Sequence, residues 1–600
     1  MSGLTNLQFL RPDCGQYLDS SKLSYQSSII HLDYGFGLFI RKAKNILPYF
    51  GSDVRSVPNI AFMPKPRFEV AVFPESALLI HQTLLDALGQ AYDIQFVAGQ
   101  EPVRRGYRGA FLFGVSREEA LRFSQTGLHC LAFIGGKTVS LPQPSEEIRF
   151  CAAVFLPECL QNRLLRDDSC DCSAAMKAEP GDEIVAKKGD HILWIHHGQP
   201  GSSVDLVGIP PSRLLKGDYL FNHFHRDNWM RLLPILFFLQ RITGWEFPAA
   251  RACFMFDDPN LHWKSYGYVD FAKIAQHSSQ HNYHVSFATV PFDGWYIHCK
   301  TVALFHANRS RLSLLVHGNN HTAKELAQND GNQALAAQAL LRIERLEKKS
   351  GLEVSRVMAA PHGACSHKMA TDLLRMGFEA ACISRGSIMQ QNPDSVWPSS
   401  FGLNQTEFLG DGMPVIPRFR LKRGCEIEIV LAAFLGQAVI PVGHHGDLAD
   451  GLELLRELAG AINSTGAVKW MDMKSIARSN FCTRREGEIL HLRMYSRRIQ
   501  LNVPQGLSQL CVHRPWLKDD QIEGLELRTR DAYPVLFSSY QKGLIPCESC
   551  EEIEIRSISS VAIDPRSISL PQTPLRSVAR RYLCEARDRL KPLFDRFLHL

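Results

Sequence analysis

Two histidines, His317 and His321, lie four residues apart in the segment LLVHGNNHTAKEL. This spacing allows either a pair of metal ligands or two polar side chains that share one helical face. A zincin protease carries a glutamate directly after the first histidine of its HExxH motif, and here that position is Gly318. The zincin class is therefore excluded, and the metal-ligand interpretation depends on the other residues of the chain.

Further polar residues follow short apolar runs elsewhere in the chain. Asp257 and Asp258 follow FMF, His362 stands in MAAPHGA, and His444 and His445 follow VIPVG. The apolar runs have the composition of buried strands. Since α/β folds collect their chemistry at the carboxyl ends of parallel strands, we expect these groups to lie near the histidine pair.

These residue types can perform metal-assisted hydrolysis. Two neutral imidazoles and one carboxylate form a three-ligand site with open positions for water and substrate. The ion lowers the pKa of its water, a second carboxylate can act as general base, and a further histidine can act as general acid. The sequence thus predicts a metal-dependent hydrolase.

Alternating strand and helix patterns position these residues. Apolar runs that predict strands alternate with amphipathic segments that predict helices, which is typical of a barrel or a doubly wound sheet. The expected strands are 251–256, 284–290, 311–318, 354–363, 379–384, 437–447 and 466–473, and the expected helices are 268–282, 332–351, 368–377 and 451–463.

The length of 600 residues predicts several domains, with the α/β pattern in the middle. Residues 1–245 predict an N-terminal α/β domain of unknown role with a small parallel sheet. Residues 246–482 form the central domain. Residues 483–600 predict a small antiparallel β-rich domain that ends in a helix.

The predicted C-terminal helix is basic and amphipathic. We expect it to pack on its own protein through its apolar positions, with docking on a membrane surface or a partner as the alternative. These apolar positions are Val578, Tyr582, Leu583, Ala586, Leu590, Phe594 and Phe597.

Composition excludes some function classes. The chain is 45% hydrophobic and 21% charged, and a net charge of +6 is too dilute to indicate a nucleic-acid partner. The first residues do not resemble a signal peptide, and the apolar segment 230–245 contains Pro234, which favours a buried helix over a membrane span. The 16 scattered cysteines are interpreted as reduced thiols, so we expect a cytoplasmic protein.

The order of the polar motifs resembles that of the polysaccharide deacetylase family, of the NodB-homology or carbohydrate esterase 4 type. The resemblance rests on a Phe-Asp-Asp strand end, HxxxH, a Pro-x-Gly strand end and a late histidine after an apolar strand. It implies a deformed (β/α) barrel and a divalent metal ion, with zinc first and nickel or cobalt as alternatives. It also implies a deacetylase that removes an acyl group, most simply N-acetyl, from a saccharide or saccharide precursor.

The resemblance also implies roles for individual residues. Asp257 matches the general base, and either His444 or His445 matches the catalytic acid. The metal ligands would be Asp258, His317 and His321, and the third motif, which contacts substrate, would be Pro361, His362 and Gly363.

The chain departs from the family pattern at several positions. Pro259 follows the Asp pair in place of glycine, and Gly318 replaces the usual Ser or Thr. Ala359 stands where the family carries an arginine that orients the base, and His362 or Arg356 are the candidates to replace it. Two alternatives therefore stay open: hydrolysis of another C–N or ester bond, and a non-catalytic saccharide-binding or assembly protein.

Overall fold

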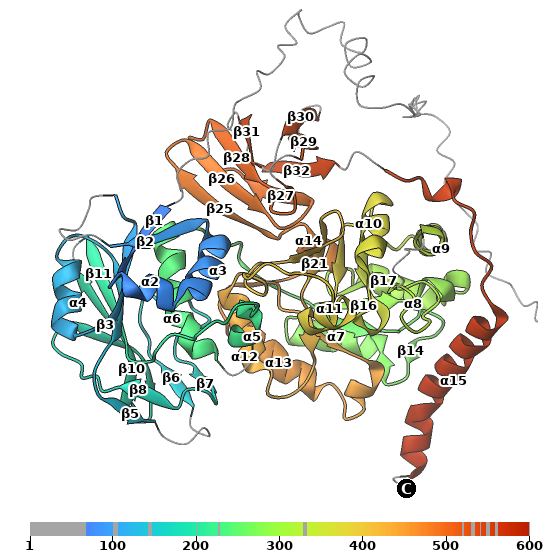
Figure 1. Ribbon diagram of the computed structural model, residues 1–600. Helices are drawn as coiled ribbons and strands as arrows, with labels where there is room; N and C mark the ends of the chain where they lie inside the picture. The colour runs from blue at the N-terminus through green and yellow to red at the C-terminus, as the bar shows by residue number, and fades with distance from the viewer. Residues whose placement is uncertain are drawn as a thin grey trace, which may run out of the picture. The chain divides into compact units, whose positions relative to one another are not determined.

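The computed structural model describes residues 68–598 except for ten short segments. These segments are 100–105, 142–146, 200, 226–227, 328–332, 519–520, 530–533, 540–541, 548–551 and 559–561. Within the described residues, the strands form two nine-stranded sheets, two four-stranded sheets and three two-stranded pairs (Figure 1).

The first large sheet is half parallel and half antiparallel. Its strand order is β2-β1-β3-β4-β11-β10-β9-β6-β7, parallel from β2 to β11 and antiparallel from there on. The prediction of a parallel sheet in this region is thus correct for the half of the sheet from β2 to β11. The bounds are Phe68–Phe73 (β1), Ile94–Ala98 (β2), Gly109–Val115 (β3), Cys130–Ile134 (β4), Ile148–Phe150 (β6), Leu164–Leu165 (β7), Asp182–Lys188 (β9), His191–Gln199 (β10) and Ser202–Val207 (β11), with a separate pair Thr138–Ser140 (β5) and Cys172–Ala174 (β8).

Helix α6 (Trp229–Thr243) is the buried apolar helix expected from the sequence, with Pro234 inside it. Its leucines and phenylalanines lie in the core beneath the first sheet. No helix among the described residues is long and apolar enough to cross a membrane. The other helices of this part are Ser76–Ile80 (α2), Gln82–Tyr92 (α3), Arg117–Ser124 (α4) and Leu220–Phe224 (α5).

The central sheet is a parallel sheet that curls into a half-barrel. Its order is β20-β21-β19-β18-β17-β16-β13-β23-β22, and only β20 is antiparallel to its neighbour. The strands are Phe254–Asp257 (β13), Val285–Thr289 (β16), Leu312–His317 (β17), Val354–Ala359 (β18), Ala380–Cys382 (β19), Glu407–Leu409 (β20), Met413–Ile416 (β21), Phe419–Arg420 (β22) and Pro441–Gly443 (β23), and Ala250–Ala252 (β12) pairs with Val468–Trp470 (β24).

The curled sheet meets part of the expectation of a deformed barrel. The βα order is the expected one, but β20 and β22 are sheet edges, so the barrel stays open. Sequence patterns also gave no strand or helix for residues 385–436, where β20, β21 and β22 lie. The helices are Phe271–Gln280 (α7), Cys299–Ala307 (α8), Gln333–Ser350 (α9), His367–Arg375 (α10), Arg385–Gln391 (α11), Glu426–Phe434 (α12), Glu453–Asn463 (α13) and Met473–Ala477 (α14).

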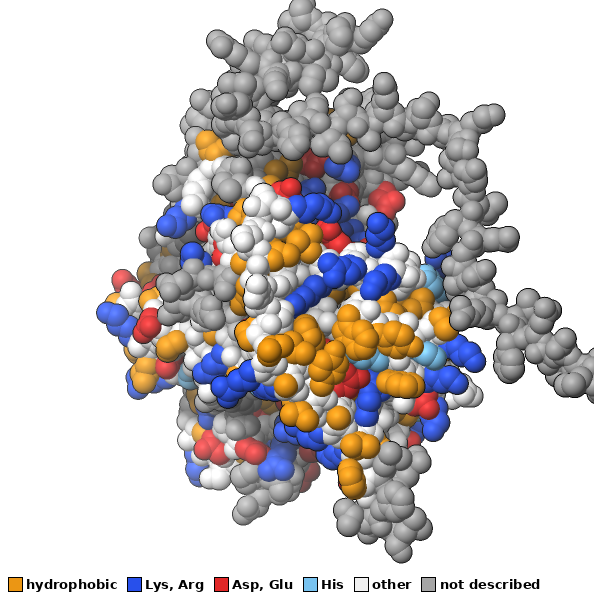
Figure 2. Space-filling model, turned by 90° about the vertical axis from the view of Figure 1, so that its right-hand side faces the viewer, with side chains coloured by type: hydrophobic (Ala, Val, Ile, Leu, Met, Phe, Trp, Pro, Cys, Tyr) orange, Lys and Arg blue, Asp and Glu red, His pale blue; other side chains and the backbone are white. Residues whose placement is uncertain are grey.

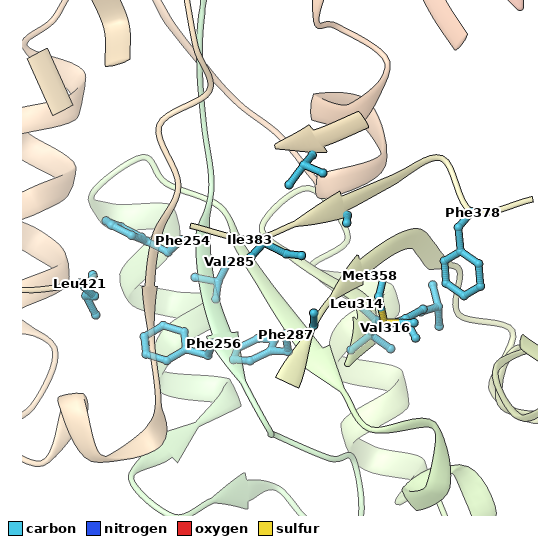
Figure 3. Close-up of a cluster of buried hydrophobic side chains, with 14 of the residues drawn as sticks. Phe254, Phe256, Val285, Phe287, Leu314, Val316, Met358, Phe378, Ile383 and Leu421 are labelled. Atoms are coloured by element: carbon cyan, nitrogen blue, oxygen red, sulfur yellow. The ribbon is translucent and has the colours of Figure 1, made fainter. Parts of the chain in front are cut away.

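The two faces of the central sheet carry different side chains. Large residues such as Phe256 and Phe287 point outward and form the main core with the helices (Figure 3). The opposite face has smaller residues, among them Ala288, Ala359 and Cys382. Since successive residues of a strand face opposite ways, this inner face also receives the last residues of several strands.

The C-terminal region contains two four-stranded sheets, β25-β26-β28-β31 and β27-β32-β29-β30, around a small core. Every pair is antiparallel, as expected, except β26 with β28, which is parallel. The strands are Phe481–Glu486 (β25), Ile489–Met494 (β26), Arg498–Asn502 (β27), Gln509–His513 (β28), Glu523–Thr529 (β29), Val535–Ser539 (β30), Lys542–Pro546 (β31) and Glu552–Ile558 (β32), and the last helix is Leu575–Leu598 (α15).

Candidate metal centre

Two strand ends bring the expected carboxylates and histidines together. Asp257 is the last residue of β13 and His317 the last residue of β17. Alternation along each strand turns both side chains inward, because Phe256 and Val316 belong to the outer core. Both side chains are buried, with 4% and 2% of their surface exposed.

Three possible ligands converge at this edge of the sheet. Single atoms of Asp258, His317 and His321 all lie within 4.8 Å of one another. Asp258 Oδ1 is 3.7 Å from His317 Nε2 and 3.1 Å from His321 Nε2. Ligands bound tetrahedrally at about 2.0–2.1 Å stand roughly 3.3 Å apart, so these separations fit one small ion.

The hydrogen bonds of this cluster favour a cation. Nδ1 of His317 donates to the Ala359 carbonyl at 2.9 Å, which leaves Nε2 with its lone pair toward Asp258. Asp258 Oδ1 is buried and accepts no hydrogen bond from the residues that the structure describes. This carboxylate oxygen, which receives no hydrogen bond within the described part of the chain, faces two imidazole nitrogens. Together the oxygen and the two nitrogens form a ligand set that suits a divalent ion.

The backbone around the cluster adopts a conformation that side-chain-bearing residues seldom take. The φ angles of Asp258, His321 and His362 are 84°, 56° and 56°, all in the left-handed region. Such conformations cost free energy and gather at functional sites. His321 therefore lies in a loop after β17, and the HxxxH spacing does not belong to a helix.

Glu325 organises this histidine loop. Its carboxylate accepts backbone N–H groups of Asn319 at 2.7 Å, Asn320 at 3.0 Å and His321 at 3.1 Å. Glu325 is 3% exposed, so these bonds are shielded from water. The sequence interpretation missed this residue, although an acidic residue in HTAKEL after the second histidine was a visible signal.

Asp257 is held by an arginine that the sequence interpretation also missed. Nη1 of Arg418 donates to the two carboxylate oxygens of Asp257 at 3.1 and 3.0 Å. The proposed substitutes for the arginine missing at Ala359 were wrong. Arg356 pairs with Glu347, and within the described part of the chain the exposed His362 forms no hydrogen bond or ion pair with Asp257.

Nearby charges keep the two carboxylates ionised. Burial alone raises the pKa of Asp257, but Arg418 and His317 outweigh burial and bring the pKa below its ordinary value. Burial raises the pKa of Asp258 in the same way, and His317, His321 and Arg581 reverse the effect. Burial and His317 lower the pKa of His321 to about 4, so its imidazole is neutral at pH 7.

His444 and His445 have different surroundings. His444 is exposed, and its charge is among those that lower the pKa of both Asp257 and Asp258. His445 is buried, lies 5.7 Å from the ring of Tyr266 between ring centres, and has Nε2 3.5 Å from Asp588 of α15. His445 is therefore engaged by α15, which leaves His444 as the candidate for the catalytic acid.

The third-motif residues lie beside the histidine loop. Pro361 is buried, and its ring lies close to Gly318, where an added Cβ would be 2.5 Å from Cγ. His362 is exposed, with its ring centre 5.9 Å from that of His321. Gly363 has a φ of 65° and lies close to Ser387.

Helix α15 adds a cation to the site from the far end of the chain. Arg581 donates from Nη2 to the backbone oxygen of Asp258 at 3.2 Å and to Asp293 at 2.6 Å. Its Nη1 lies 3.8 Å from Asp258 Oδ1. No motif connects Arg581 with the strand ends, so sequence reasoning had no signal for this contact.

Comparisons with solved structures give weak likenesses to deacetylases. A putative polysaccharide deacetylase from Mycobacterium smegmatis is 14% identical and aligns over 38% of this chain and 90% of its own, with a TM-score of 0.29. A CE4 esterase from Streptococcus mutans is also 14% identical, over 37% and 86%, with a TM-score of 0.22. An aldolase from Escherichia coli is 14% identical over 36% and 87%, with a TM-score of 0.19.

Sequence comparisons add no relative. No family model matches the chain, and no curated protein matches it. The site geometry therefore has to support any statement about function.

Proposed function

We propose that the chain is a metal-dependent hydrolase of the deacetylase type. The observation that carries the proposal is the convergence of Asp258, His317 and His321 beside the ionised Asp257. In this arrangement three side chains would bind the ion, and the separate carboxylate of Asp257 beside them stays available for proton transfer. That separation of roles is what hydrolysis requires.

The residues divide the reaction between them. A divalent ion, zinc first and nickel or cobalt as alternatives, supplies Lewis acidity that polarises an acyl oxygen and lowers the pKa of a water molecule. Asp257, held by Arg418, accepts a proton from the water that attacks the acyl carbon. His444 donates a proton to the amine as the C–N bond breaks, so the products are a carboxylic acid and a free amine.

The substrate class follows from the order of the motifs in the chain. The sequence order of Asp pair, HxxxH, Pro-x-Gly and late histidine is that of enzymes that remove N-acetyl groups from saccharides. We therefore assign an acylated, most simply N-acetylated, saccharide or saccharide precursor as the substrate.

Metal content tests the first part of the proposal. Purified full-length protein, stripped with a chelator and reloaded with zinc, cobalt or nickel, is expected to retain one ion per chain by elemental analysis. The variants His317→Ala and His321→Ala should lose it, while the control His306→Ala, an exposed histidine on α8, should not. Absence of a stoichiometric ion in the unaltered protein would overturn the assignment.

Acetate release tests the second part. Metal-loaded protein is expected to release acetate from N-acetylated oligosaccharides. Asp257→Asn should retain its ion and lose roughly 10²–10⁴-fold in turnover, because the general base is removed. Retained turnover in Asp257→Asn would contradict the assigned role.

A further inference from the structure

Helix α15 packs on the protein through its charged side, contrary to the expectation from its apolar positions. Arg581, Glu585 and Asp588 are buried, at 4%, 7% and 4% exposure. Glu585 accepts a hydrogen bond from His262 at 3.0 Å, and Asp588 accepts one from the Tyr266 hydroxyl at 2.9 Å. The inner face of α15 is thus polar and pairs with polar side chains of the central domain.

This orientation leaves the apolar side of α15 exposed. Leu575 is 85% exposed, Leu583 71%, Leu590 45% and Phe594 62%. Residues at positions 583, 590 and 594 are separated by seven and four residues, so they lie along one stripe of the helix. An exposed apolar stripe of this length on a helix marks an interaction surface.

A basic stripe runs beside the apolar one. It consists of Arg576, Arg580, Arg587 and Lys591, which are separated by four, seven and four residues and are all exposed. Of the acidic residues of α15, Asp588 is buried and pairs with the exposed Arg587 of this stripe, Glu585 is buried against His262, and Asp595 accepts a hydrogen bond from Tyr268. Among the described side chains of the helix, the charges directed to solvent are therefore positive.

Aromatic side chains extend the surface from the helix onto the central domain. Tyr582 of α15 is 46% exposed, and its ring lies 6.3 Å from that of Trp295, which is 53% exposed. Tyr296 is exposed beside Trp295. Figure 2, which turns the α15 side of Figure 1 toward the viewer, shows hydrophobic side chains gathered beside lysine and arginine side chains.

We propose that this outer face of α15 docks on an anionic lipid membrane. Leucine and phenylalanine in one stripe can enter the headgroup region, while the parallel basic stripe meets the lipid phosphates. Tryptophan and tyrosine at the edge suit the boundary between water and hydrocarbon. Because the exposed charges among the described side chains of α15 are all positive, an anionic surface complements this face.

The proposal is independent of the chemistry of the metal centre, although it bears on that site. The inner face of the same helix holds Arg581 against Asp258 and Asp293. A membrane under the outer face would therefore lie next to the candidate active site. An intact inner face and an occupied outer face can coexist, since they use different side chains.

Vesicle flotation with the full-length protein tests the proposal. The protein is expected to float with vesicles that contain phosphatidylglycerol and not with vesicles of phosphatidylcholine alone, and added salt should weaken binding. The double variant Leu583→Glu/Leu590→Glu should lose binding by about tenfold or more, since two apolar anchors become anions. Val396→Glu, at a side chain 95% exposed on another part of the surface, is the matched control.

Three results would overturn the proposal. One is absence of flotation with phosphatidylglycerol vesicles at low salt. Another is binding by the double variant as tight as that of the unaltered protein, with circular dichroism showing that both are folded. The third is a doubled mass in solution that reverts to a single chain in the double variant, since a second copy would then cover the face.

Discussion

Arg418 donates to both carboxylate oxygens of Asp257 across 161 residues of sequence. The arginine stands between β21 and β22, whereas the position that would carry it in the deacetylase pattern is Ala359 on β18. Ala359 still contributes, through a backbone oxygen that accepts from His317. The charge that orients Asp257 thus comes from the connection between β21 and β22, and the oxygen that accepts from His317 comes from β18.

Replacing Arg418 should impair the base without removing the metal ligands. Arg418→Gln leaves Asp257 buried without its partner, which costs about 3–5 kcal/mol when one member of a buried pair is removed. Turnover is expected to fall roughly 10²-fold or more while the ion is retained. Acetate release and elemental analysis on the same preparation measure both effects.

Two further variants make the Arg418 test specific. Arg418→Lys keeps the charge but lacks the planar guanidinium, so we expect partial activity. Arg356→Gln breaks a pair with Glu347 away from Asp257 and should leave turnover near that of the unaltered chain. Equal losses in the two glutamine variants would show that Arg418 acts only through stability.

Gly318→Ser, which restores the residue type usual between such histidines, should damage this site. An added Cβ would lie 2.2 Å from Glu325 Oε1 and 2.5 Å from Pro361 Cγ, at a φ of 61°. The loop must move, and we expect weaker zinc binding in equilibrium titration. Gly386→Ser, with open space around its Cβ, is the control. Unchanged zinc affinity in Gly318→Ser would contradict this account.

Glu325→Gln should loosen the histidine loop. The substitution removes the charge that accepts from the backbone N–H groups of residues 319–321, and hydrogen bonds to charged groups contribute about 1.5–3 kcal/mol each. Metal affinity is expected to fall roughly 10–100-fold, as for other groups that orient metal ligands. Glu353→Gln, in an exposed pair with Lys474, should bind zinc normally.

The contact between α15 and the central domain should depend on pH through His262 and Glu585. Burial lowers the pKa of His262, but the hydrogen bond to Glu585 outweighs it and the pKa is raised. Burial raises the pKa of Glu585, and His262 reverses this and brings it to about 2. Protonated His262 therefore stabilises the docked helix fully below pH 6.5. This stabilisation is lost as the pH rises through the raised pKa of His262.

The contribution of Glu585 has the opposite direction. The stabilisation by ionised Glu585 is present above pH 4.5 and is lost as the pH falls toward the lowered pKa of about 2. Hydrogen exchange of α15, corrected for intrinsic rates, should show stronger protection near about pH 6 than near about pH 9. His262→Gln should remove most of that difference, and an equal difference in this variant would refute the assignment.

Local patterns were sufficient to predict that Asp258, His317 and His321 lie close together. Asp258 and His317 lie directly at the ends of apolar strands, His321 follows four residues after His317, and the direction of those strands follows from the βα order. Arg418 and Arg581 reach the site from segments whose sequence has no strand-end signal. Their contribution depends on tertiary packing, which the pattern of residues along the chain does not encode locally.

The orientation of α15 was predicted wrongly for a related reason. Helical periodicity shows that a helix has an apolar face, and burial of that face is the usual outcome. Here the polar partners His262, Tyr266 and Asp293 belong to the segments that follow β13 and β16, and they pair with the charged face instead. Periodicity identifies two faces but not the chemistry of the surface that meets them.

The position of Arg581 in the chain sets an order of assembly during translation. Arg581 follows His321 by 260 residues. At about 5–20 residues per second, the ribosome adds Arg581 roughly 10–50 seconds after His321. During that interval the three ligands can meet an ion before a guanidinium group lies beside Asp258. A chain that is completed without metal would then have to accept its ion past a helix already in place, so uptake of the ion should be slower after synthesis than during it.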